Sequence, residues 1–450
     1  MQPFTFVHAA DLHLDAVLPG PGAKVLPAEA DGGACVRLLR EAVFMALDRL
    51  VDLCLREKAA FLLLAGDVFH RDEGSLKACF ALREACLRLG EEGVEVFWAR
   101  GNHDFAAWNT EILSPPDNLR VFSREGEAFP AGSRGKALAL VRGISHSGPG
   151  ERENLARKLA AGAGPEKLFQ IGLLHCAVRG GSAGHEVYAP CEPGDFKTGS
   201  LDYWALGHVH APGVVSPAPL AIYPGSLQGL HINESGPHGC YLARVDALGR
   251  TRAFPVPLAP VRWENIEFDL HALSEEDASG RDSLESLEKA LLEILEDMGE
   301  KAAPALALLC RLELRGRSRL DSFLRREENL DELTLRLNLA LAGKDARPCL
   351  IRVKDIALRS SPDSDLEALR RSDNLVGETL RKAEAFIRAL EDPEGPEEDG
   401  MPLRLLAELE KLYADPRCKD YLARPDSAEL AELARAAVVL CLDLFEADKC

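Results

Sequence analysis

Five short blocks of metal-ligating residues each follow an apolar run in this sequence. They are Asp11-Leu-His13, Gly66-Asp67-Val-Phe-His70, Gly101-Asn102-His103-Asp104, Leu174-His175 and Gly207-His208-Val-His210. Carboxylate, amide and imidazole groups together suit two divalent cations about 3.5–4 Å apart, which activate water and stabilise phosphoryl oxygens. The blocks therefore predict a two-metal site that hydrolyses phosphoesters.

The runs before the blocks are short and rich in β-branched or aromatic residues, so they predict buried strands. They cover residues 4–8, 61–65, 94–99, 169–174 and 203–206. The ligands are then expected at the C-terminal ends of strands, the edge where open α/β sheets bind ligands. Helices predicted over residues 36–58 and 76–89 connect the strands. Gly66, Gly101 and Gly207 are expected in tight turns.

Two cations at one site need a bridging carboxylate, and Asp67 is the expected bridge. The nitrogen and oxygen ligands include no thiolate. This set favours Mn²⁺ first, with Mg²⁺, iron or Zn²⁺ as alternatives, because softness and geometry discriminate poorly among these ions here. The sequence leaves the identity of the metal open.

The five blocks, in this order, resemble the calcineurin-like metallophosphoesterase superfamily. Three segments are similar to its SbcD-type DNA-repair exonucleases, and especially to the bacterial YhaO-like branch: residues 10–15, 66–70 and 223–231. The similarity is strong up to about residue 260 and weak beyond. It implies an α/β fold in which a β-sandwich is flanked by helices, with a small α/β capping domain and a helical C-terminal region.

The resemblance also implies which residues form the site. One metal ion would take Asp11, His13, Asp67 and His210, and the other would take Asp67, Asn102, His175 and His208. His103 matches the family's catalytic histidine, which contacts the scissile phosphate and protonates the leaving oxygen. Asp104 would orient the ring of His103 and raise its basicity. His70 matches a position that contacts nucleic-acid phosphates.

Each of these residues also has a structural interpretation. An isolated Asp-X-His or Gly-His-X-His pair is more often hydrogen-bonded than metal-bound, and only the ordered set of blocks favours a metal site. His103 could be a structural neighbour of Asn102, and His70 an ordinary loop histidine. His8 is expected in the core or beside the ligands, and His231 at the edge of the site. Asp15 is expected to cap or brace the first loop.

Composition limits the class of protein. The 450 residues, 46% of them hydrophobic, can bury large cores and suggest two or three domains. No apolar run approaches the ~18 residues of a membrane span, and the first ten residues do not resemble a signal peptide. The twelve cysteines include no Cys-X-X-Cys pair. We therefore expect a cytoplasmic protein with reduced thiols and no membrane partner.

The net charge of −19 is unusual for an enzyme that binds nucleic acid. Residues 1–264 carry 26 basic and 30 acidic side chains, whereas residues 265–450 carry 27 and 42. The excess acidity therefore lies in the C-terminal part, which is not expected to contact phosphates. Ala211-Pro212 departs from the family pattern, which often has basic residues there, and this departure puts a phosphate contact at that point in doubt.

Breaks in the pattern predict three domains. Pro255, Pro257 and Pro260 mark the end of a nuclease-like domain, residues 1–262. Residues 263–360 alternate predicted strands and helices, as in a small α/β capping domain or an unrelated accessory domain. Residues 361–450 form a helical C-terminal region with predicted helices over 366–390, 403–413 and 428–445. An acidic linker rich in proline and glycine covers 391–402.

The expected function is that of a metal-dependent DNA exonuclease or endonuclease acting in DNA repair. The resemblance implies an SbcC-like coiled-coil ATPase as partner, docked on the C-terminal helices, although a self-contained bundle would carry the same apolar stripe. A homodimer is also compatible with the family. Two alternatives stay open: a phosphodiesterase or phosphatase acting on nucleotides or other small phosphoesters, and a DNA-end-binding scaffold with an idle site.

Overall fold

The structure is a computed structural model of the 450-residue chain. It describes residues 1–20, 32–70, 75–104, 113–133, 135–148, 150–162, 168–179, 188–273, 283–342, 349–363, 366–391, 411, 429–435, 437–438 and 441. The chain divides into two compact units. The first contains residues 1–266, 290–312 and 331–356, and the second contains residues 267–289, 313–330 and 357–450.

Two six-stranded sheets form the centre of the first unit. One has the order β12-β11-β1-β2-β3-β4, with β1 (Phe4–Ala9), β2 (Phe61–Leu64), β3 (Glu95–Trp98), β4 (Leu119–Val121), β11 (Gly239–Val245) and β12 (Thr251–Pro257). The other has the order β5-β6-β7-β8-β10-β9, with β5 (Glu127–Ser133), β6 (Lys136–Ile144), β7 (Phe169–His175), β8 (Tyr203–Gly207), β9 (Gly213–Pro217) and β10 (Leu220–Tyr223). Strands β1 to β4 are parallel to one another, as are β6, β7, β8 and β10.

Alternation along the strands explains why the two sheets pack face to face. In β1, Phe4 and Phe6 point into a core shared with the second sheet, whereas Val7 points into a core on the other face. Phe6 stacks on Phe61 of β2 at 5.2 Å and meets Tyr203 of β8 edge to face at 5.1 Å. Successive side chains of a strand point to opposite faces, so a strand buried on both faces is apolar throughout.

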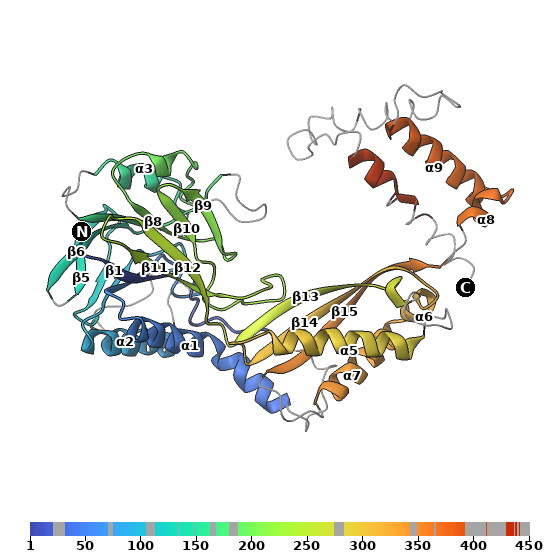
Figure 1. Cartoon of the computed structure of the whole chain (residues 1–450), viewed down its shortest axis with the longest axis horizontal. Helices are drawn as coiled ribbons and strands as arrows, with labels where there is room; N and C mark the ends of the chain where they lie inside the picture. The colour runs from blue at the N-terminus through green and yellow to red at the C-terminus, as the bar shows by residue number, and fades with distance from the viewer. Residues whose placement is uncertain are drawn as a thin grey trace. The chain divides into compact units, whose positions relative to one another are not determined.

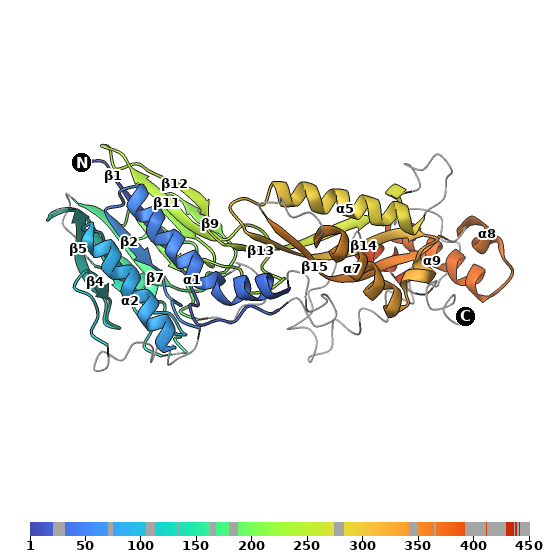
Figure 2. The same cartoon turned by 90° about the horizontal axis from the view of Figure 1, so that it is seen from below.

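Helices cover the outer faces of the sandwich. Helices α1 (Gly32–Arg56) and α2 (Leu76–Glu91) lie side by side against the first sheet (Figure 2). Helix α3 (Leu155–Ala160) lies on the opposite side, against the second sheet (Figure 1). Ser75 caps the N-terminus of helix α2, because its Oγ accepts a hydrogen bond from the Ala78 amide at 3.1 Å. The result is a β-sandwich flanked by helices, as expected.

The five strands expected before the ligand blocks are confirmed to within one residue. Strands β5, β6, β9 and β10, which complete the second sheet, were not expected. None of the helices in the described part of the chain combines the length and the apolar composition needed to cross a membrane.

The chain beyond residue 260 alternates strands and helices as expected. Strands β13 (Val261–Asp269), β14 (Ala307–Ser318) and β15 (Leu350–Pro362) form a three-stranded sheet in that order. The helices between them are α5 (Leu284–Glu300), α6 (Asp321–Leu324) and α7 (Glu327–Ala342). The expected domain boundaries at residues 262 and 360 stay a prediction.

The helix expected over residues 366–390 is interrupted. It forms α8 (Leu366–Arg371) and α9 (Leu375–Glu391). Asn374 causes the break, because its side-chain oxygen accepts the Gly377 amide at 2.9 Å and so starts a new helix. Residues 429–435 are helical. The linker 391–402 and the helix expected over 403–413 lie almost entirely outside the described residues, as does most of the helix expected over 428–445.

His8 makes the folded state sensitive to acid. Its Nε2–H donates to the Leu206 carbonyl at 3.2 Å and its Nδ1 lies 3.0 Å from the Tyr203 hydroxyl, so it is a core residue, as expected. Burial lowers the pKa of His8 from 6.5 to about 3. Between these values the unfolded chain binds a proton that the folded chain does not. The stability that the folded state has with a neutral His8 is therefore fully present above pH 6.5, and it is lost as the pH falls below this value.

Between pH 7 and pH 5, His8 should lower the free energy of unfolding of the wild type by about 2 kcal/mol, because each pH unit below the unfolded pKa costs about 1.4 kcal/mol. We expect His8→Gln not to show this loss. Urea unfolding at the two pH values measures this difference. The exposed His271→Gln is the control and should behave like the wild type. Equal pH dependence in His8→Gln and the wild type would show that His8 does not contribute.

Candidate metal centre

The candidate ligands gather where strands of both sheets end. Asp11 follows β1, Asp67 follows β2 and Asn102 follows β3 in the first sheet. His175 ends β7 and His208 follows β8 in the second sheet. The loops after β1 and β2 are also joined, because the Asp11 amide donates to the Gly66 carbonyl at 3.0 Å. The expectation that the candidate ligands lie at the C-terminal ends of strands is confirmed, while their role as ligands stays a prediction.

The backbone at this edge is strained. Asp11, His13, Asp67 and His208 have positive φ angles of 50°, 45°, 47° and 108°. Such angles are uncommon for residues other than glycine, and they concentrate at functional sites where surrounding structure holds them in place. Strain at four neighbouring site residues indicates that the fold holds these side chains in one arrangement.

Two glycines at this edge of the sheets are required because neighbouring side chains lie too close for a Cβ atom. A Cβ atom at Gly101 would collide with the Asp67 carboxylate, and one at Gly66 would collide with the His175 ring. Gly66 also has a φ of +85° and so fits the expected tight turn. At Gly101 the reason is space for a neighbouring candidate ligand.

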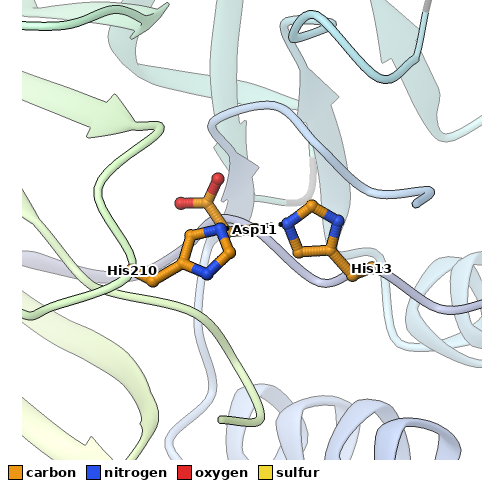
Figure 3. A group of neighbouring side chains, drawn as sticks. All are labelled: Asp11, His13 and His210. Carbon is orange, nitrogen blue, oxygen red and sulfur yellow. Dashed lines mark hydrogen bonds between the residues drawn. The ribbon is translucent and has the colours of Figure 1, made fainter. Parts of the chain in front are cut away.

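One group of ligand atoms comes from Asp11, His13 and His210 (Figure 3). Their ligand atoms all lie within 4.8 Å of one another, and the Nε2 atoms of His13 and His210 are 3.1 Å apart. The other nitrogen of His210, Nδ1, donates to Glu234 Oε1 at 2.8 Å. A neutral His210 therefore carries its lone pair on Nε2, the nitrogen that belongs to the group.

A second group contains Asp11, Asp67 and His175. His175 Nε2 lies 3.4 Å from Asp67 Oδ2 and 3.1 Å from the side-chain oxygen of Asn102. The His208 ring lies 5.2 Å from the His175 ring, and the His208 amide donates to both Asp11 oxygens at 3.1 and 3.2 Å. Asp11 belongs to both groups, whereas Asp67, the expected bridge, lies in the second. Its bridging role stays a prediction.

The donor atoms of the second group fit a cation. His175 Nδ1–H donates to the Ala65 carbonyl at 2.9 Å, so a neutral His175 carries a lone pair on Nε2. That lone pair faces the oxygens of Asn102 and Asp67, which also accept. Three acceptors that converge repel one another unless a proton or a metal ion lies between them. In the first group, the buried Nδ1 of His13 has no hydrogen-bond partner among the described residues.

The pKa values of the buried carboxyl and imidazole groups also indicate that this site favours a positive charge. Burial raises the pKa of Asp11 to about 6. Burial lowers the pKa of His175, but the charge and hydrogen bond of Asp67 outweigh this effect and raise it to about 9. Burial would raise the pKa of Asp67, but nearby histidines, chiefly His175, hold it below its ordinary value. The site favours a cation beside its carboxylates, so the residues present fit divalent metal ions.

His103 and His70 lie together beside the first group. Their rings are stacked, with centroids 5.7 Å apart, and lie 5.6 and 5.2 Å from the ring of His13. The His103 amide donates to Asp67 Oδ1 at 3.0 Å. The His70 side chain is exposed, and its amide donates to Asp15 Oδ1 at 2.6 Å. Asp15, expected to cap or brace the first loop, thus joins that loop to the loop after β2.

Asp104 has different partners from those expected. Its carboxylate accepts hydrogen bonds from the Phe69 amide at 3.0 Å, the Gly101 amide at 3.0 Å and the Trp98 indole at 3.3 Å. The ring of His103 is not among its partners in the described part of the chain. The reason is that Asp104 is fully buried under the loops, whereas His103 is half-buried at the site. Asp104 joins the loop that carries Asn102 to the loop that carries Asp67.

The sequence did not identify two residues that support candidate ligands. His146 Nε2–H donates to the His175 carbonyl at 2.7 Å, and Glu234 accepts from His210. Nothing in the spacing of His146 indicates this role. The sequence offers a weak indication of the role of Glu234, because this residue is the only carboxylate between Asp202 and Asp246. His231, expected at the site edge, lies with Nε2 3.4 Å from the same Glu234 oxygen.

Residues 4–212 match a family model described as calcineurin-like phosphoesterase. This part of the chain is similar to calcineurin-like phosphoesterases. The match supports the superfamily expected from the ligand blocks for these residues, while the narrower SbcD-type resemblance stays a prediction. The phosphoesterase domain accounts for less than half of the chain.

Curated proteins similar to the chain include a metallophosphoesterase and a DNA repair protein. An uncharacterized metallophosphoesterase, YhaO of Bacillus subtilis (strain 168), is 36% identical over 250 residues, which cover 54% of this chain and 58% of the relative. The DNA double-strand break repair protein Mre11 of Methanopyrus kandleri is 27% identical over 269 residues, which cover 54% of each chain. The chain thus spans little more than half the length of these relatives.

Among solved structures, a dimetal phosphatase from Danio rerio is similar at 13% identity, over 57% of this chain and 99% of that chain. Its TM-score of 0.31 is too low to support an inference about this chain.

Proposed function

We propose that the chain is a metal-dependent phosphodiesterase that cleaves DNA. The observation that carries this proposal is the pair of ligand groups that share Asp11, with the stacked rings of His103 and His70 beside them. Two divalent cations held there would activate a water molecule and neutralise charge on the phosphoryl oxygens. Mn²⁺ is the favoured metal. Asp11, His13, Asp67, Asn102, His175, His208 and His210 are the proposed ligands.

Two histidines outside the ligand groups would act on the substrate. His103 protonates the leaving oxygen from a ring nitrogen, as a half-buried imidazole outside both ligand groups can do. His70 contacts a substrate phosphate, because its side chain is exposed and lies against His103. The strained loops at Asp11 and Asp67 keep the ligands fixed while the substrate reacts.

Two facts favour DNA over a small phosphoester. A relative that aligns with 54% of the chain is named as a DNA double-strand break repair protein. In addition, the chain carries a sheet and helices beyond the phosphoesterase domain, which provide more surface than a small substrate needs. The same metal chemistry serves nucleotides and other small phosphoesters, and this remains the second candidate function.

An SbcC-like coiled-coil ATPase is the proposed partner, with the helices after residue 361 as its docking region. Part of the apolar surface of these helices is used within the chain. Phe386 and Leu390 of α9 pack against Ala431 of the helix over residues 429–435. This contact supports the alternative that this part of α9 packs within the chain itself. A partner would therefore dock on the other faces of the C-terminal helices. A homodimer also stays a proposal.

Cleavage assays with Mn²⁺ test the proposed function. We expect the chain to cut end-labelled DNA, either single- or double-stranded, and to hydrolyse bis-p-nitrophenyl phosphate. EDTA and the variant Asp67→Asn should abolish both activities. Hydrolysis of the small ester alone would favour the second candidate function. DNA binding without any hydrolysis, also after addition of an ATPase partner, would identify a scaffold and overturn the proposal.

A further inference from the structure

Glu234 belongs to a hydrogen-bond network that reaches the first ligand group. Its Oε1 accepts from His210 Nδ1 at 2.8 Å, and its Oε2 accepts from the Leu230 amide at 2.8 Å. The Ser226 hydroxyl lies 3.4 Å from Oε2. The side chain is only 11% exposed. Both carboxylate oxygens are therefore held, and the group has one orientation.

This orientation decides which nitrogen of a neutral His210 carries the proton. A carboxylate only accepts hydrogen bonds, so the proton of a neutral His210 lies on Nδ1. The lone pair then lies on Nε2, the atom 3.1 Å from Nε2 of His13. If Glu234 were removed, the ring could carry its proton on either nitrogen and could rotate. A fixed tautomer and a fixed ring both favour metal binding.

The same network fixes the backbone at His210. The Ser226 amide donates to the His210 carbonyl at 3.0 Å, and the Ser226 hydroxyl lies 2.9 Å from His238 Nδ1. His238 Nε2–H in turn donates to the Glu234 carbonyl at 3.1 Å. Glu234, Ser226 and His238 thus form a closed set of bonds that holds both the ring and the main chain of His210.

We propose that Glu234 is a positioning residue, which fixes the tautomer and the ring orientation of His210 for metal binding. This inference rests on the proposed function, because it needs His210 to be a metal ligand. The rival explanation is that Glu234 only braces its loop through the Leu230 amide. The two explanations differ in what they predict for metal affinity in the absence of substrate.

Metal-dependent thermal stabilisation tests the proposal without an activity assay. We expect Glu234→Gln to weaken the apparent affinity for Mn²⁺ by about 10–100-fold. Asp246→Asn is the matched control, because Asp246 also accepts backbone amides, from Leu248 and Arg250, but contacts no candidate ligand. The control should keep the affinity of the wild type. Unchanged affinity in Glu234→Gln, with loss of stability alone, would overturn the proposal.

A double-mutant cycle shows whether Glu234 acts through His210. In the background of His210→Ala, Glu234→Gln should lower Mn²⁺ affinity by no more than about twofold, because the ring that it positions is gone. An equal loss in both backgrounds would contradict the proposed role. If the wild type itself shows no stabilisation by Mn²⁺, the proposed metal site fails, and the inference about Glu234 fails with it. If the wild type binds and Glu234→Gln binds equally, the inference fails alone.

Discussion

Replacing His103 with alanine should lower phosphodiester hydrolysis by about 10²–10⁴-fold, the usual contribution of a general acid. Stabilisation by Mn²⁺ should stay as in the wild type, because the His103 side chain belongs to neither ligand group. Its bond to Asp67 comes from the backbone amide, which alanine keeps. Steady-state hydrolysis of a phosphodiester together with thermal stabilisation by Mn²⁺ measures both properties.

His70→Ala is the matched control for this prediction. The His70 ring stacks on that of His103, but it is exposed and its backbone is held by Asp15. We expect a higher KM for DNA and a smaller effect on kcat in this variant. Activity of His103→Ala within tenfold of the wild type would exclude His103 as the proton donor.

Replacing Asp104 with alanine should destabilise the phosphoesterase domain by about 3 kcal/mol or more. The substitution leaves the Phe69 and Gly101 amides and the Trp98 indole without their acceptor, and each buried unpaired donor costs about 1–3 kcal/mol. Activity should fall too, because Asp104 joins the loops that carry the candidate ligands after β2 and β3. Denaturant unfolding and phosphodiester hydrolysis measure the two effects.

Two further variants separate this prediction from the role expected from the sequence. Trp98→Phe removes a single donor and keeps an aromatic ring, so its loss of stability should be smaller than that of Asp104→Ala. If Asp104 instead orients His103, Asp104→Asn should lower kcat without lowering stability. A stable Asp104→Ala protein with low kcat would thus favour the sequence-based expectation over the hydrogen bonds of the structure.

The amino-acid sequence by itself determined the types of candidate ligand and their place at the ends of strands. Both follow from local features. A short apolar run predicts a strand, and a polar block directly after it must lie at the end of that strand. The five strands before the blocks were found in this way. The similarity to calcineurin-like phosphoesterases, which the family model supports for residues 4–212, followed from the order of the blocks.

Only the tertiary structure decided which of these residues meet. His13 and His210 are 197 residues apart in sequence, and His210 and Glu234 are 24 apart. The sharing of Asp11 by two ligand groups depends on how the two sheets pack. The burial of Asp104 depends on how the loops after β2 and β3 of the first sheet meet. Spacing along the chain predicts contacts within one element or loop. It does not predict contacts between loops of different strands, because packing of the sheets sets their distance and direction.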